Sequence, residues 1–196
     1  MASFLKEEKY LCILNHEERF AHKLARKVIT KPVPPIWMIL IPVFFVLHAY
    51  RIKQYEKGLK AFADNYLKSR KASLEAVLES IEKDVPVDIE KMAAGVEELT
   101  AEPRAKYEKL LQALTDHYRA LMDTPGENIT TLVQRHYQRK SSYQLYLDRL
   151  VRTEHEFNMS LLPQIEGEET ELRDIIIQIK GYITQLHADD LDELFA

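Results

Sequence analysis

The chain has 196 residues, a formal net charge of −4, five glycines and a single cysteine, Cys12. One cysteine forms no internal disulfide and no cysteine-based zinc site, so disulfide-stapled and zinc-finger classes are excluded. Few glycines and a 30% share of charged residues are typical of an all-helical protein of one domain with an appendage.

Charge is unevenly distributed along the chain. Residues 1–60 contain eleven lysines and arginines against five acidic residues, whereas residues 61–196 contain sixteen against twenty-six. Anionic lipid headgroups attract basic segments of this kind. A basic segment can also bind nucleic acid, but the acidic remainder and the apolar run described below argue against it. We therefore expect membrane lipids as partners, and no nucleic acid.

The first predicted element is an amphipathic basic helix, residues 1–31, with its regular part over 3–30. Its apolar residues follow helical spacing, and Glu17 is the one break in that face. Such a helix could lie on a membrane surface or pack on a helical bundle. We favour packing, because the face is only partly aliphatic. The apolar positions are Tyr10, Ile13, Phe20, Leu24 and Val28.

The second element is an apolar run, residues 33–50, with the sequence VPPIWMILIPVFFVLHAY and no charged residue. Its 18 residues are at the short limit for crossing a bilayer, which takes about 20. Apolar side chains would cover every side of a helix here, whereas a surface helix has a polar face. A buried core helix is the alternative. We predict a membrane segment over 32–50, with lipid contacts from Trp37, Ile39, Leu40, Ile41, Pro42, Phe44, Phe45, Leu47 and Tyr50.

The flanks of this run do not decide its topology. Trp37 and Tyr50 lie near its two ends, as aromatic residues at a membrane interface do. Basic residues occur on both sides, so the positive-inside rule gives no orientation. A bitopic helix and a re-entrant hairpin, which Pro42 would favour, both stay open; we expect the large C-terminal part in the cytoplasm in either case. The predicted headgroup contacts are Lys23, Arg26, Lys27, Lys31, Arg51 and Lys53.

Helical periodicity continues beyond the apolar run to Val85-Pro86, which predicts one helix from about residue 36 to 84, about 70 Å long. Asp88 is a candidate N-cap for a short helix, and Glu102-Pro103 is typical of the start of the next. Pro125-Gly126 ends that helix. Two further helices are expected, over about 128–162 and 168–188. Short connections indicate antiparallel neighbours, so residues 51–188 are predicted to form an antiparallel helical bundle.

The C-terminal segment, residues 189–196, combines four acidic residues with three apolar ones. Acidic segments with a few apolar anchors are suited to docking on a basic, grooved partner. We predict Leu191, Leu194 and Phe195 as docking residues, the alternative being a frayed helix end that keeps the chain soluble.

No pattern in the chain indicates catalysis. A di-iron bundle needs Glu-x-x-His from two helices, and that pattern does not occur. Phosphate-binding loops, nucleophile elbows and His-Glu-x-x-His are likewise missing from the sequence. His136 is the histidine of most interest, because it falls on an apolar stripe. We expect no enzyme activity, no metal site and no cofactor.

The sequence leads to three hypotheses. The first is a membrane-anchored helical scaffold, assembly or accessory subunit that binds another protein, with a homo-oligomer as one form of that partnership. The second is a ferritin-like or haem-binding redox protein tethered to the membrane. The third is a membrane-remodelling protein that uses residues 32–50 as a re-entrant hairpin.

Overall fold

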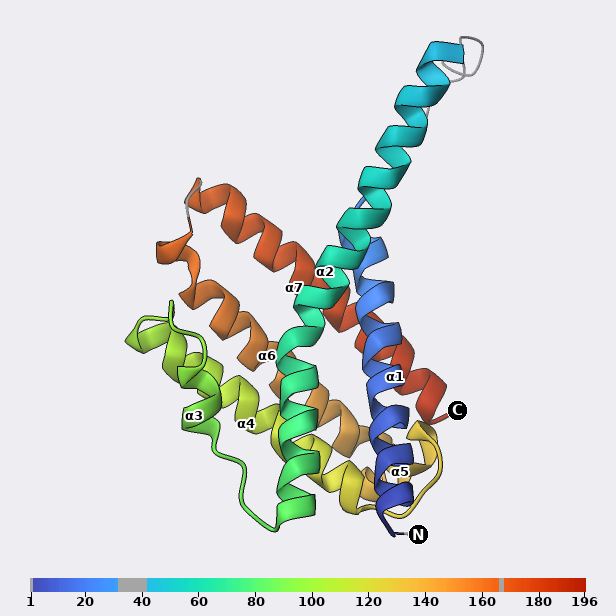
Figure 1. The fold of residues 1–196 in the computed structure, drawn as a ribbon, viewed down its shortest axis with the longest axis vertical. Helices are drawn as coiled ribbons and strands as arrows, with labels where there is room; N and C mark the ends of the chain where they lie inside the picture. Colours follow the sequence, from blue (N-terminus) through green and yellow to red (C-terminus); the bar gives the residue numbers. More distant parts are fainter. Residues whose placement is uncertain (1, 32–41, 166–167) are drawn as a thin grey trace.

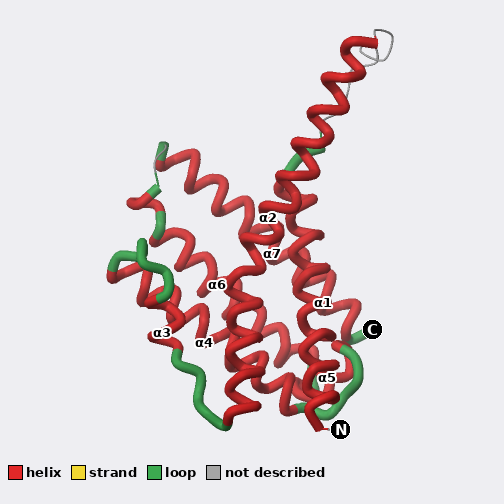
Figure 2. Tube along the Cα trace, in the orientation of Figure 1, coloured by secondary structure: helices red, strands yellow, loops and turns green. Residues whose placement is uncertain are grey.

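The computed structural model describes residues 2–31, 42–165 and 168–196. In these ranges the chain forms helices joined by short connections, with no strand. The helices are α1 (Ala2–Val28), α2 (Pro42–Lys83), α3 (Ile89–Ala94), α4 (Ala101–Asp123), α5 (Ile129–Tyr137), α6 (Lys140–Ser160), a short 3₁₀ turn (Leu162–Gln164) and α7 (Glu169–Leu194). The predicted all-α bundle is confirmed for this part of the chain (Figure 2).

Helices α1 and α2 run antiparallel, side by side, along one side of the bundle, and both belong to its core (Figure 1). Ile13 of α1 and Leu74 and Val77 of α2 are buried in the main hydrophobic cluster, with residues of α4 to α7. The N-terminal helix therefore packs on the bundle, as its partly aliphatic face predicted, and forms one core with the helices that follow the apolar run.

Three alanines form the seam between α1 and α2. Ala21, Ala25 and Ala63 are buried together, with exposed fractions of 0 to 1%. Small side chains let two helix backbones approach closely, so larger residues at these positions would push the pair apart. This seam holds α1 and α2 together next to the part of α2 that projects from the bundle.

Capping side chains begin two of the helices, and the first of them, Asp88, was predicted from the sequence. The Asp88 carboxylate accepts from the Lys91 amide at 2.9 Å and begins α3. Asn128 caps α5 in the same way, its side-chain oxygen accepting from the Thr131 amide at 2.9 Å. Each bond satisfies one backbone donor that a helix start leaves unpaired.

The helix predicted over 128–162 is two helices in the structure. Gln138 has φ of 60°, a left-handed conformation that ends α5, and α6 begins at Lys140. The break changes the direction of the chain, so that the Tyr137 ring of α5 lies 4.9 Å from the Tyr143 ring of α6. Periodicity missed this break because both helices place apolar residues toward one core.

The last helix runs to Leu194, beyond the predicted end at residue 188. Leu191 and Leu194 have exposed fractions of 6% and 4%, and Phe195 packs against the same cluster. Leu191 and Leu194 are therefore part of the bundle's own core, and Phe195 is half-buried against it; their predicted docking to a partner stays a prediction. Their burial outweighs the acidic character of the segment and keeps α7 helical to its end.

Candidate functional site

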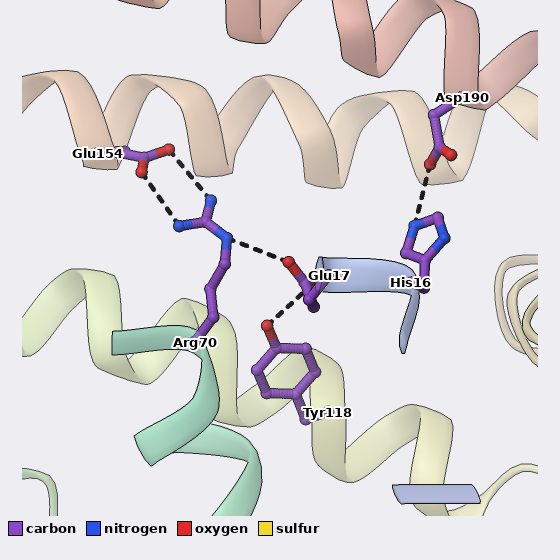
Figure 3. Close-up of polar contacts among 6 residues, drawn as sticks. All are labelled: His16, Glu17, Arg70, Tyr118, Glu154 and Asp190. Carbon is purple, nitrogen blue, oxygen red and sulfur yellow. Dashed lines mark hydrogen bonds and ion pairs between the residues drawn. The ribbon is translucent and has the colours of Figure 1, made fainter. Parts of the chain in front are cut away.

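A set of charged side chains lies inside the bundle, where α1, α2, α4 and α6 meet (Figure 3). Arg70 of α2 donates from Nη1 and Nη2 to the two carboxylate oxygens of Glu154 at 3.1 and 3.2 Å. Its Nε lies 3.2 Å from Oε2 of Glu17, and the Tyr118 hydroxyl donates to the other Glu17 oxygen at 2.9 Å. We call these four residues the ionic centre.

The ionic centre is shielded from water. Arg70 is 2% exposed and Tyr118 is 0% exposed, and the Tyr66 ring lies 3.9 Å from the guanidinium carbon. Burial by itself would lower the pKa of Arg70, but Glu154, Tyr66 and Glu17 together raise that pKa well above its ordinary value. The guanidinium is therefore a permanent buried cation between two carboxylates, with bidentate geometry on Glu154.

A second pair of charged groups adjoins the ionic centre. His16 Nε2 of α1 lies 3.3 Å from the Asp190 carboxylate of α7 (Figure 3). Burial favours neutral His16, but the hydrogen bond and charge of Asp190 outweigh it and raise the pKa of His16. This pair joins the first helix to the last.

Two further histidines are buried without a carboxylate bond. Burial, and to a smaller extent the neighbouring histidines, lower the pKa of His117 to about 3, and its Nδ1 lies 2.7 Å from the Tyr137 hydroxyl. Burial, together with Arg70, lowers the pKa of His187 to about 3 as well. Both imidazoles are therefore neutral at physiological pH.

The space between these groups is small. Glu17 and Arg70 of the ionic centre line a cavity of about 20 Å³, together with His16, His117, His187, Asp190 and apolar and tyrosine side chains. That volume fits one water molecule and no organic ligand. Within the described residues, no three histidine, cysteine or acidic side chains are grouped as metal ligands. The centre is thus built to tie α1, α2, α4 and α6 together.

The histidine that the sequence singled out does not belong to this buried arrangement. His136, which lies on an apolar stripe of the sequence, is exposed, whereas His117, six residues before the end of α4, is buried. The sequence analysis did not predict the ionic centre. Its one signal in the sequence was Glu17, a lone acid on an apolar helix face, because such an acid needs a buried cationic partner. Nothing local marked Arg70 as that partner.

The predicted membrane residues fall into two groups. Trp37, Ile39, Leu40 and Ile41 lie outside the described residues. Pro42 to Tyr50, which include the other five, form the first turns of α2, and this part of the helix projects away from the rest of the molecule (Figure 1). Among the helices that the structure describes, none combines the length and the apolar character needed to cross a membrane.

The predicted headgroup residues flank the projecting part. Arg26, Lys31, Arg51 and Lys53 are exposed. The other two are held by the bundle, since Lys23 lies 3.8 Å from Glu193 and Lys27 donates to the Gln185 side-chain oxygen at 3.0 Å. These charges therefore lie on α1 and α2 on either side of the apolar run. In comparisons with known proteins, no family model, curated protein or solved structure matches the chain.

Proposed function

We propose that this protein is a membrane-anchored helical scaffold that attaches to one leaflet through a re-entrant hairpin and keeps its bundle on one side of the membrane. The observation that carries the proposal is the packing of α1 and α2 in one core, before and after the apolar run. A bitopic segment would need these two helices on opposite sides, and so would pull Ile13, Phe20 and Leu24 out of the hydrophobic clusters in which the bundle buries them.

The dimensions of the projecting helix fit a shallow insertion. Residues 42–50 are apolar in sequence apart from His48 and form about 13 Å of helix at 1.5 Å per residue. A bilayer core is about 30 Å thick, so this length matches about one leaflet. Pro42 at the first position of α2 suits a chain that turns at this point, because proline is favoured in the first helical turn.

The scaffold role follows from what the bundle contains. Its buried charged groups are engaged with each other, and its internal cavity is too small for haem, quinone or a similar cofactor. The redox alternative therefore gains no support from the ionic centre. Ile175 and Ile177 of α7 are about half exposed, so the bundle offers apolar surface to another protein while the hairpin holds it at the membrane. A membrane-remodelling protein would insert the same hairpin as a wedge into one leaflet.

Topology tests the proposal directly. Cys12→Ser removes the natural thiol, and Glu8→Cys on α1 or Gln144→Cys on α6 then places a single thiol at an exposed position. We expect the chain to resist carbonate extraction, and a membrane-impermeant maleimide to label both positions from the same side of sealed membranes. Labelling from opposite sides would show a bitopic chain, and release by carbonate would show that the run is not inserted; either result overturns the proposal.

A further inference from the structure

Exposed lysines and arginines are concentrated on the ends of α1 and α2 near the place where α2 leaves the bundle. A Cβ placed on Gly58 would lie 3.6 Å from Cδ1 of Ile29, so the end of α1 is level with this residue of α2. Basic residues next to Ile29 and on both sides of Gly58 therefore lie on the same end of the α1–α2 pair. We call the following six exposed residues the collar: Arg26, Lys31, Arg51, Lys53, Lys57 and Lys60.

The collar is a concentrated and unneutralised positive charge. Residues 23–31 contain no acidic residue, and residues 51–60 contain only Glu56. Within the residues that the structure describes, the ion pairs involve Lys23 at the edge of this region but no collar residue. Residues 61–196, by contrast, contain twenty-six acidic residues against sixteen lysines and arginines, and six of these cations form ion pairs in the described part of the chain. The positive field is thus confined to the base of the hairpin.

We infer that the collar binds the headgroups of an anionic phospholipid leaflet, so that the hairpin selects negatively charged membranes. This inference rests on the proposed insertion and names the lipid class it requires. Residues 42–50 would fill one leaflet, which places Arg51, Lys53 and Lys57 on the following turns at the headgroup layer. The acidic bundle beyond Lys60 is repelled by the same surface and stays clear of it.

The collar is expected to raise the affinity for anionic membranes strongly, because its charges act on the same surface. One basic residue near an anionic surface contributes about fivefold in membrane affinity, and salt screens the effect. Replacing three collar residues should therefore weaken binding to anionic vesicles by about 100-fold, while leaving binding to neutral vesicles unchanged.

The test uses the full chain and its only tryptophan, Trp37, whose emission shifts to the blue on entering lipid. Binding is titrated with phosphatidylcholine vesicles and with vesicles that also contain phosphatidylserine. The collar variant is Lys53→Gln/Lys57→Gln/Lys60→Gln. The control, Arg139→Gln/Arg149→Gln/Arg152→Gln, removes the same charge from exposed positions around and on α6. Helical content measured by circular dichroism checks that both variants fold.

We expect tight, salt-sensitive binding of the wild type and the control to anionic vesicles, and the loss of that preference in the collar variant. Equal wild-type binding to both vesicle types would overturn the collar inference and leave the inserted hairpin standing. Binding to neither type would overturn both. If inorganic phosphate at low ionic strength displaced the protein more than chloride of equal ionic strength, the collar would be a site for free phosphate, which also contradicts the inference.

Discussion

Arg70 is the residue on which most of the bundle's polar interior depends. Its guanidinium touches carboxylates from α1 and α6, and the ring of Tyr66 covers one face. Three bonds to one buried cation fix the relative positions of the helices that supply them. A charged group in this environment is stable only while its partners remain.

Replacing Arg70 by methionine should therefore be strongly destabilising. Arg70→Met leaves Glu17 and Glu154 facing each other without a cation, and we expect a loss of about 3–5 kcal/mol in the free energy of unfolding. Urea unfolding followed by circular dichroism in mild detergent measures the loss. Lys68→Met, an exposed change on the same helix, should stay within about 0.5 kcal/mol. Adding Glu17→Gln and Glu154→Gln to Arg70→Met should recover part of the stability; no recovery would show that charge imbalance is not the cause.

His117 should make stability depend on pH. Its folded pKa is about 3, below the ordinary value of 6.5, so between these values the unfolded chain binds a proton that the folded chain does not. Stability therefore falls as the pH is lowered through this window, by about 1.4 kcal/mol per pH unit for this one group.

We expect His117→Gln to remove that share of the slope, so that unfolding free energies measured from pH 6 down to pH 4 fall less steeply than in the wild type. His22→Gln, at an exposed position of α1, is the matched control and should keep the wild-type slope. His16 acts in the opposite sense: its folded pKa is raised, so the stability it contributes is present below pH 6.5 and is lost as the pH rises through its folded pKa. An unchanged slope in His117→Gln would contradict the assignment of a buried neutral imidazole.

At the scale of the helices, the pairing of α1 with α2 is the feature that bears on function. The two helices meet through Ala21, Ala25 and Ala63, and each also carries part of the ionic centre. Apolar contact and the Glu17–Arg70 bond thus act on the same pair of elements. The two helices on either side of the apolar run are therefore fixed to each other by apolar packing and by an ion pair.

A larger side chain in the alanine seam should separate these helices. Ala63→Leu adds volume where the exposed fraction is 0%, and overpacking of this kind costs about 1–3 kcal/mol. Ala61→Leu, an exposed change nearby on α2, should have little effect on unfolding. Equal stabilities of the two variants, measured by urea unfolding, would show that α1 and α2 are not closely packed at Ala63.

At the scale of the whole molecule, both arms of the hairpin start from one bundle and the apolar run lies between them. Trp37 is in the middle of residues 32–41, which connect the arms. In a re-entrant hairpin this position is far from the collar, whereas in a bitopic helix Trp37 would lie at the starting interface.

Depth-dependent quenching distinguishes these arrangements. We expect bromines placed deep in the acyl chains to quench Trp37 more strongly than bromines placed near the headgroups. The double variant Trp37→Phe/Tyr50→Trp moves the tryptophan probe to the collar side of the inserted helix. In this variant the bromines near the headgroups should quench more strongly than the deep ones. Strongest quenching of native Trp37 near the headgroups would contradict the hairpin.

The sequence by itself determined the features that depend on neighbouring residues. Helical periodicity, the cap at Asp88, and the uncharged run before Arg51 can all be read locally, since each reflects the chemistry of a few adjacent side chains. Only the tertiary structure decided which helices share a core, that Glu17 meets Arg70, and that Leu191 is buried in the bundle's own core. These depend on contacts between residues far apart in the chain, where the free energy of burial, and not local propensity, selects the partner.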